Sequence, residues 1–378
     1  MSKILRVNMT EKTAVYEDVA EKYLGKGGRW LTSYIVNEEV PADCHPLGPN
    51  NKVVIAAGMV TGTAAPSSGR ISVGGKSPLT GGIKEANAGT PFSQKLARMN
   101  IKAIVVEGQG SGSWLLKLDK DKADFIEAEE YKGKGMYETA DMIKDAYGEK
   151  TAFMGIGQAG EAKMAMAGVS FNDTEGRPSR YAGRGGLGAV LGSKGLKAIV
   201  LDDSGAPGVE MADKDLFRQG QKKLVEALQT HDVTKPRGTL NTFGTAALVN
   251  VLNEAGGLPT RNFSSGTFKG AQATSGERLA EIIKERGGTG MTGHGWHPGC
   301  VIRCSNVYPK EDGSEHVSCV EYESDWAFGA NCEIDNLDQI AELVRLCNDY
   351  GIDTIEAGVT LGVAMEAGIL PFGDGEGA

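Results

Sequence analysis

The sequence lacks several features that would place it in a common class of protein. It has no run of about 18 apolar residues, which a membrane-spanning helix would need. It has no basic block, and its formal net charge at pH 7 is -9, which argues against nucleic acid and anionic membranes as partners. The first residues, MSKILRVNMTEKTAVYEDV, contain no apolar core typical of a signal peptide. We therefore expect a cytoplasmic protein that acts on a small or neutral substrate.

Two nucleotide-binding motifs are also missing, although glycine is abundant. The chain has 54 glycines among 378 residues, roughly twice the usual 7% share, as expected where backbone approaches a large buried cofactor. The segment from Arg180 to Gly195, RYAGRGGLGAVLGSKG, has neither P-loop spacing nor the strand-first GxGxxG order. Its arginines and backbone N–H groups at a helix start could hold a phosphate. A tight turn between strands would explain the same glycines.

The cysteines are concentrated in the second half of the chain. Five of the six lie between Cys300 and Cys347, and clustered thiols in an intracellular protein usually indicate metal or redox chemistry. Cys300 and Cys304 form C-x3-C in HPGCVIRCSN, with His297 ahead of them. Glycine and proline break any helix there, so the ligands could face one iron–sulfur or zinc centre. Cys332 is predicted to be a buried structural thiol, as is Cys347.

The alternation of apolar residues and glycines predicts an α+β fold with two domains. Residues 1–205 are predicted to be rich in β-strands, and residues 206–378 mostly helical. The segment GSKGLKAIVL resembles ARMNIKAIVV, each time as a helix followed by a strand, so the first domain should contain two similar halves. The predicted helices of the second domain span residues 213–229, 240–255, 276–285, 337–349 and 354–367.

Seven motifs, taken in order, resemble the tungsten or molybdenum aldehyde:ferredoxin oxidoreductase family. They are KILRVNMTEK, GKGGRW, SPLTGG with ANAGTPF, RYAGRGGLGAVLGSKGLKAIV, HPGCVIRCSN, EYESDWAFGANCEIDNLDQI and NDYGIDTIEAG. The resemblance covers nearly the whole chain. It implies a β-rich base beneath a tungsten or molybdenum bound by two pyranopterins, with a [4Fe-4S] cluster beside one pterin, a Mg²⁺ ion bridging the pterin phosphates, and helical domains around them. It also implies oxidation of an aldehyde or related carbonyl to the acid, with electrons passing to ferredoxin or an iron–sulfur subunit.

The resemblance assigns cofactor-binding roles to four segments. Backbone donors and arginines for the pterin phosphates and ring edges are implied at Arg70, Asn87, Ala88, Gly89, Arg180, Ala182, Gly183, Arg184, Gly185 and Gly186. The second pterin is implied to meet a D/N-x-x-G-L/I motif at Asn348, Gly351, Ile352 and Asp353. A helix end closed by glycine would explain this last motif equally well.

The iron–sulfur loop departs from the family pattern. Family members carry C-x2-C-x3-C and a distant fourth cysteine, whereas here His297 occupies the first place. Cys300 and Cys304 match, and His297 or His294 could ligate iron, because imidazole replaces thiolate in some clusters. We do not expect a normal four-ligand cluster within this chain.

For catalysis, the resemblance places a glutamate in the EYE segment. It favours Glu323, with Glu321 second, as the carboxylate that activates water or accepts a proton beside the metal. A surface pair of acids is the alternative.

Family chains continue beyond the point that corresponds to Ala378, so we expect full activity to require the missing part. The expected protein partners are a complementing C-terminal fragment or a second copy in a homodimer. A competing hypothesis is a non-catalytic remnant or assembly subunit without a complete cofactor. A third is a zinc-stabilised binding protein that uses His297, Cys300 and Cys304, with stoichiometric zinc and no colour.

Overall fold

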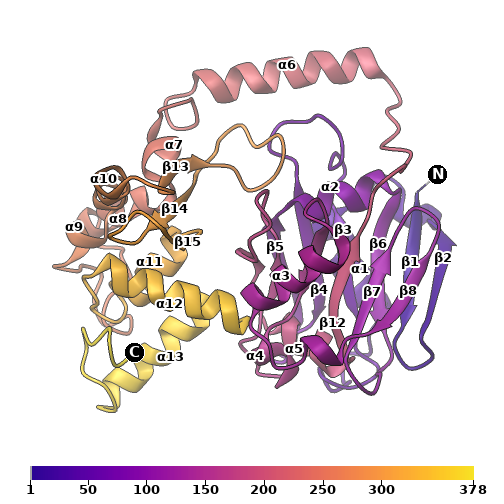
Figure 1. Ribbon diagram of the computed structural model, residues 1–378, viewed down its shortest axis with the longest axis horizontal. Helices are drawn as coiled ribbons and strands as arrows, with labels where there is room; N and C mark the ends of the chain where they lie inside the picture. The colour runs from indigo at the N-terminus through magenta and orange to yellow at the C-terminus, as the bar shows by residue number, and fades with distance from the viewer. Residues whose placement is uncertain (1) are drawn as a thin grey trace. The chain divides into compact units, whose positions relative to one another are not determined.

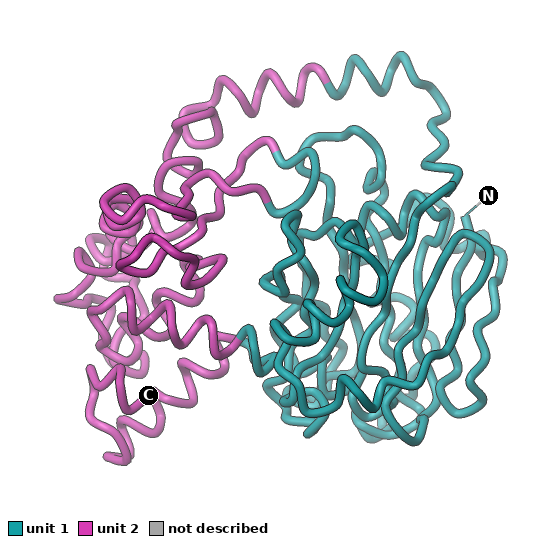
Figure 2. Tube along the Cα trace, in the orientation of Figure 1, with its two compact units in different colours: residues 1–221, 296–300, 348–353 teal, residues 222–295, 301–347, 354–378 magenta. Residues whose placement is uncertain are grey.

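The computed structural model describes residues 2–378 (Figure 1). The chain forms two compact units (Figure 2): unit 1 comprises residues 1–221, 296–300 and 348–353, and unit 2 comprises residues 222–295, 301–347 and 354–378. The division falls inside helix α6 (Lys214–Thr230), and the domain boundary near residue 205 remains a prediction. Within residues 2–378, no helix has the length and apolar character to cross a bilayer.

Unit 1 is built on two six-stranded sheets. Sheet A has the order β2-β1-β6-β3-β4-β5, and sheet B has the order β8-β7-β12-β9-β10-β11. The strands of sheet A are β1 (Lys3–Asn8), β2 (Thr13–Asp18), β3 (Val53–Ala57), β4 (Arg70–Lys76), β5 (Ile83–Gly89) and β6 (Ile101–Glu107). Those of sheet B are β7 (Trp114–Leu118), β8 (Ala123–Glu127), β9 (Ala152–Gly155), β10 (Val169–Phe171), β11 (Arg180–Ala182) and β12 (Leu196–Leu201).

The two sheets are copies of one design, which confirms the predicted internal repeat. In each, the first and last strands of the half pair in parallel, β1 with β6 and β7 with β12, while the other neighbours are antiparallel. Helices occupy equivalent places along the chain. They are η1 (Glu21–Tyr23), α1 (Gly28–Glu39) and α2 (Pro91–Arg98) in the first half, and η2 (Glu129–Tyr131), α3 (Met136–Tyr147), α4 (Gln158–Glu161) and α5 (Leu187–Ser193) in the second.

Apolar alternation along the strands creates three buried layers in unit 1. One cluster combines side chains of both sheets with α2 and α5, as Ile55 of β3 and Ile199 of β12 illustrate. A second cluster covers the other face of sheet A with α1, and a third covers the other face of sheet B with α3. Because both faces of each sheet are covered, β3, β9 and β12 consist entirely of buried residues.

Unit 2 is mostly helical, with one small sheet of order β13-β14-β15. Its elements are α7 (Thr239–Phe243), η3 (Thr245–Ala247), α8 (Leu248–Glu254), α9 (Ala271–Thr274), α10 (Gly276–Arg286), β13 (Met291–His294), β14 (Ser305–Pro309), β15 (Glu315–Val317), α11 (Tyr322–Phe328), most of α12 (Leu337–Tyr350) and α13 (Thr354–Glu366). The α+β fold class is therefore confirmed. The single helix predicted over residues 240–255 is wrong, because Gly244 has a φ of 65° and divides this segment into α7, η3 and α8.

Candidate functional site

In unit 1, the predicted cofactor-binding segments lie at equivalent ends of the two sheets. Arg70 begins β4 and pairs with Gly89, the last residue of β5. In sheet B, Ala182 ends β11 and pairs with Val169 of β10. The end of β5 at Gly89 therefore corresponds to the end of β11 at Ala182 in the repeat. The edge strands β5 and β11 contact each other, so one segment from each half reaches a common edge.

Two arginines converge on one aromatic ring at this edge. The guanidinium carbon of Arg70 lies 5.2 Å from the ring centroid of Trp296, and that of Arg180 lies 5.5 Å from it. The Arg70 guanidinium donates to Asn87 Oδ1, and Asn87 Nδ2 donates to Ser72 Oγ at 3.0 Å. Arg180 is only 4% exposed. The concentration of positive charge on partly desolvated side chains favours the binding of an anion.

Trp296 was not predicted as a site residue. It immediately precedes His297 in GHGWHPGC, and no spacing rule for metal ligands includes it. Its indole Nε1 is shielded from solvent and, among residues 2–378, finds no hydrogen-bond partner. A buried donor without an acceptor is costly, so this atom indicates a place for a bound acceptor.

Glycines let the loop of residues 296–300 approach the sheet closely. A Cβ on Gly69 would lie 2.4 Å from Cγ of His297, and a Cβ on Gly89 would lie 2.9 Å from Cε3 of Trp296. The loop is fixed by the Ser67 amide, which donates to Gly299 O at 3.0 Å. The rings of His297 and Trp296 therefore pack directly against the backbone of Gly69 and Gly89. Any side chain at these two glycines would clash with the rings.

The motif at residues 348–353 packs against the second half of the repeat. The amide of Gly168 donates to Gly351 O at 2.9 Å, and the amide of Asp353 donates to Met166 O at 3.0 Å. The Tyr181 hydroxyl donates to Asn348 O, and a Cβ on Gly183 would lie 2.7 Å from Asp353 Oδ1. α12 does end here with Gly351 at a φ of 80°, so the segment is both a glycine-closed helix end and a neighbour of the Arg180 segment.

Another buried donor lies in this motif. Asn348 Nδ2 is shielded from solvent and has no hydrogen-bond partner within residues 2–378. Like Trp296 Nε1, it is a buried donor of unit 1 that a bound acceptor would satisfy.

The glycine-rich segment after β11 is a tight connection. Gly185 and Gly186 have φ values of 94° and 73°, and Gly186 leads directly into α5. The amide of Gly188 donates to Ala167 O at 2.9 Å, so this helix-start N–H is already used. Arg184 is exposed. The donors best placed for an anion are thus the side chains of Arg70 and Arg180, and the N–H group of Gly188 is not among them.

His297 is held as a neutral imidazole. It is 5% exposed, and its Nδ1 lies 2.8 Å from Pro298 O. Burial lowers the pKa of His297, as do the charges of Arg70 and Arg180, although the hydrogen bond to Pro298 opposes them. A neutral ring whose Nδ1 is engaged can offer Nε2 to a metal.

The cysteines of the predicted metal loop fall in different units. Cys300 follows His297 in unit 1, while Cys304 belongs to unit 2, as does His294. All six cysteines lack disulfide bonds. Cys332 is fully buried, and burial raises the pKa of its thiol to about 12. Such a thiol is a poor metal ligand at neutral pH, as the sequence predicted.

The two candidate catalytic glutamates stand at the start of α11 in unit 2. Glu321 is the N-cap residue, and its carboxylate accepts hydrogen bonds from the Thr245 hydroxyl at 2.6 Å and the Ser305 hydroxyl at 2.8 Å. Glu323 lies in the first helical turn. Glu321 therefore helps to fix this helix end, and the choice of Glu323 for proton transfer remains a prediction from the family resemblance.

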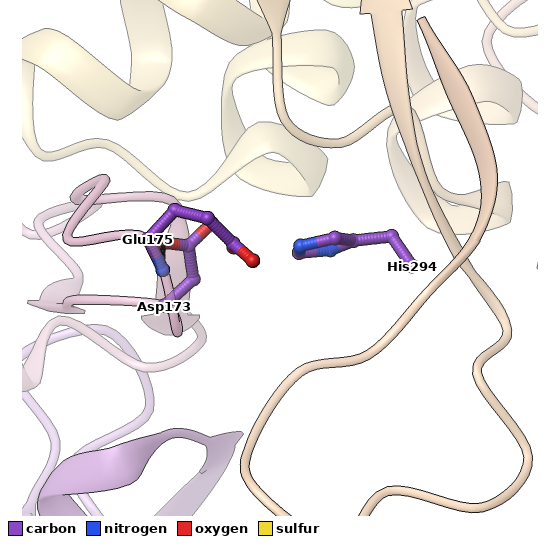
Figure 3. A group of neighbouring side chains, drawn as sticks. All are labelled: Asp173, Glu175 and His294. Carbon is purple, nitrogen blue, oxygen red and sulfur yellow. Dashed lines mark hydrogen bonds between the residues drawn. The ribbon is translucent and has the colours of Figure 1, made fainter. Parts of the chain in front are cut away.

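The turn between β10 and β11 carries two further acids, Asp173 and Glu175, which Figure 3 draws together with His294 of unit 2. The carboxylate of Asp173 accepts from the amides of Glu175 and Arg177, each at 2.9 Å, and from the Arg177 guanidinium at 3.1 Å. Asp173 thus orders the turn that leads into Arg180.

Comparison with known families and proteins agrees with this geometry. Residues 4–203 match the N-terminal domain of aldehyde ferredoxin oxidoreductase, and residues 219–374 match its domains 2 and 3. The tungsten-containing aldehyde ferredoxin oxidoreductase of Pyrococcus horikoshii is 40% identical over 370 residues, and that of Pyrococcus furiosus is 38% identical over 369. Each alignment covers 96% of this chain and 58% of the relative.

A solved structure shares the fold. The active site complex BamBC of benzoyl coenzyme A reductase, in complex with 1,5-dienoyl-CoA, superposes with a TM-score of 0.79 at 21% identity, covering 98% of this chain and 56% of the other. The matched residues span most of the sequence, and they include every segment described above. The chain belongs to the aldehyde ferredoxin oxidoreductase family.

Proposed function

We propose that this protein is a tungsten or molybdenum pyranopterin oxidoreductase that oxidises an aldehyde or related carbonyl to the acid. The observation that carries the proposal is the pair Arg70 and Arg180, one from each half of the repeat, over the single ring of Trp296 in unit 1. The two halves of unit 1 each contribute one arginine, and this arrangement suits a cofactor that itself has two similar anionic parts.

The side chains of unit 1 fit the organic part of such a cofactor. Trp296 Nε1 and Asn348 Nδ2 are buried donors without acceptors among residues 2–378, and phosphate or pterin oxygens and nitrogens would satisfy them. Arg70, Asn87, Ala88 and Gly89 would hold one pterin. The other would be held by Arg180, Ala182, Gly183 and the segment with Asn348, Gly351, Ile352 and Asp353, and a Mg²⁺ ion could join their phosphates. When bound, the metal centre accepts two electrons from the substrate.

The residues present do not fit a four-thiolate [4Fe-4S] cluster. The loop supplies only Cys300 and Cys304, with His297 in place of a first cysteine, and Cys332 is buried with a raised pKa. We propose that electrons leave to ferredoxin, which the names of the tungsten-containing relatives include, or to an iron–sulfur subunit in its place.

The proton chemistry is assigned to Glu323. Conversion of an aldehyde and water to a carboxylate releases two electrons and three protons, and one proton leaves when water adds to the carbonyl carbon. A carboxylate oxygen of Glu323 accepts that proton and releases it to solvent before the next turnover. Glu321 helps to position the start of α11, because its carboxylate accepts from the Thr245 and Ser305 hydroxyls and the Thr245 oxygen accepts from the Tyr322 amide.

The chain spans 58% of the length of these relatives, so the reaction should be tested with and without added complementing protein. The substitution is Glu323→Gln, with Glu281→Gln on the outside of α10 as the control. The readout is aldehyde-dependent reduction of a viologen dye under anaerobic conditions, alongside tungsten and molybdenum content. Loss of a general base lowers kcat about 100-fold or more. Full activity of E323Q at unchanged metal content would refute the assignment.

A further inference from the structure

The internal repeat places two equivalent lysines in different surroundings. Lys102 of β6 and Lys197 of β12 occupy the same bulge, because the parallel register passes from Ile101 to Ala103 in one sheet and from Leu196 to Ala198 in the other. The two lysines therefore occupy equivalent positions in the two halves of the repeat. The two positions can be compared directly within one molecule.

In the second half, Lys197 is neutralised by the chain itself. Its Nζ lies 2.5 Å from Oε1 of Glu161, and its side chain is only 1% exposed. Glu161 is the last residue of α4, in the turn that follows β9, where the amide of Gly160 donates to Gly157 O at 3.0 Å. A buried ammonium group is thus matched by a carboxylate on a short aliphatic stem.

In the first half, this carboxylate is missing. The turn that follows β3 has the same geometry, with the amide of Thr61 donating to Gly58 O at 3.2 Å, so that Gly62 stands at the position of Glu161. Gly62 has a φ of 86°, and a Cβ there would lie 2.8 Å from Cβ of Ala97. Burial alone is responsible for lowering the pKa of Lys102, with no contribution from any carboxylate.

Lys102 instead lines a cavity of about 360 Å³. The wall includes the apolar side chains of Ala57, Ala97 and Ile101, together with Lys26 and the amide side chain of Asn100. Lys26 is exposed and lies above the ring of Trp30, at 4.9 Å from the centroid. Among residues 2–378, the exposed Glu210 is the one acid in the wall. Ser2 and Thr61 add polar groups to the wall. A mixed wall with a small apolar part beside two ammonium groups suits a small anion with a short alkyl stem.

We propose that this cavity is a binding site for a short unbranched aliphatic carboxylate. The carboxylate of the ligand pairs with Lys102, as the carboxylate of Glu161 pairs with Lys197. Its alkyl stem lies along Ala57, Ala97 and Ile101. This inference is independent of the pterin site, because it uses none of the residues assigned there.

The test is equilibrium dialysis of the full chain with radiolabelled butyrate, at constant ionic strength in chloride. The wild type is expected to bind one saturable equivalent, and Lys102→Met should weaken binding at least tenfold. Lys102→Arg should retain it, since it preserves the charge. The control Lys150→Met removes an exposed lysine of unit 1 and should bind like the wild type. Thermal unfolding followed by circular dichroism verifies that each variant is folded.

A second variant uses the repeat itself. Glu161→Ala removes the carboxylate that neutralises Lys197, and this lysine lines a smaller cavity of about 150 Å³. E161A should therefore bind a second equivalent of butyrate. Absence of saturable binding to the wild type, equal binding by K102M, or one equivalent only in folded E161A would each overturn the proposal.

Discussion

Asp325 has its carboxyl group in a fully buried position, and this burial changes its pKa. It lies in α11 and is fully buried, and within residues 2–378 neither carboxylate oxygen makes a hydrogen bond of good geometry, although the Thr274 hydroxyl interacts with the carboxylate. Burial raises its pKa well above the ordinary value, and interaction with the Thr274 hydroxyl offsets this only in part. The carboxyl group is therefore protonated under conditions in which an exposed aspartate is charged.

The first prediction concerns the pH dependence that follows. The unfolded chain releases the Asp325 proton near pH 3.9, whereas the folded chain keeps it to a higher pH. Above pH 3.9, stability therefore falls as the pH rises towards the folded pKa, by up to about 1.4 kcal/mol per pH unit. In urea unfolding from pH 5 to 8, D325N should gain stability relative to wild type as the pH increases.

Asp338→Asn is the matched control for this series. The Arg286 guanidinium lowers the pKa of Asp338, so its stabilising charge is present above the unfolded pKa and is lost only at lower pH. D338N should lose the same stability at every pH from 5 to 8. A stability difference between D325N and wild type that stays constant over this range would contradict the account of Asp325.

Glycine positions allow a second prediction. Gly69→Ala places a methyl group 2.4 Å from Cγ of His297 and should lower the free energy of unfolding by about 1–3 kcal/mol, as overpacking does. Gly220→Ala in α6 meets nothing within 4 Å and should raise it by about 0.5–1 kcal/mol. Urea unfolding measures both. Equal effects of the two substitutions would show that His297 does not rest on Gly69.

At the level of elements, apolar strands were easier to predict than polar ones. β6 and β12 each contain a buried apolar run after a lysine, AIVV and AIVL, and the sequence predicted both as strands. β4 and β5 contain RISVGGK and IKEANAG, and their glycines and charges hid them, because close backbone packing and not side-chain hydrophobicity decides their conformation. β10 and β11 are three residues each, too short for any periodicity to show.

The repeat gives a third prediction, about equivalent lysines. Lys197→Met leaves the partly buried Glu161 without its partner and should cost about 3–5 kcal/mol of stability. Lys102→Met removes a desolvated ammonium group that has no carboxylate partner and should cost far less. Unfolding in urea compares them, and the double variant K197M/E161Q should recover part of the loss. Similar losses for K102M and K197M would contradict the difference between the two halves.

At the level of the whole molecule, the sequence predicted which segments matter but not how they meet. Arg70 and Arg180 were chosen from motifs, and unit 1 brings both to the ring of Trp296. Trp296 itself could not be predicted, because its importance comes from a long-range contact and not from a spacing. The glycine loop at 183–186 was expected to offer backbone donors, yet Gly188 N–H donates to Ala167 O. Tertiary packing therefore decides which donors remain for a ligand.

The central claim is that the two arginines hold a metal pterin cofactor, and the most direct measurement is metal and pterin content. The chain should be purified anaerobically from cells grown with tungstate and molybdate, next to Arg180→Met and the exposed control Arg218→Met. We expect tungsten or molybdenum with two pterins in the wild type and in R218M, and loss of both in R180M without loss of folding. Wild-type protein without either metal, or R180M that retains both metal and pterin, would contradict the account.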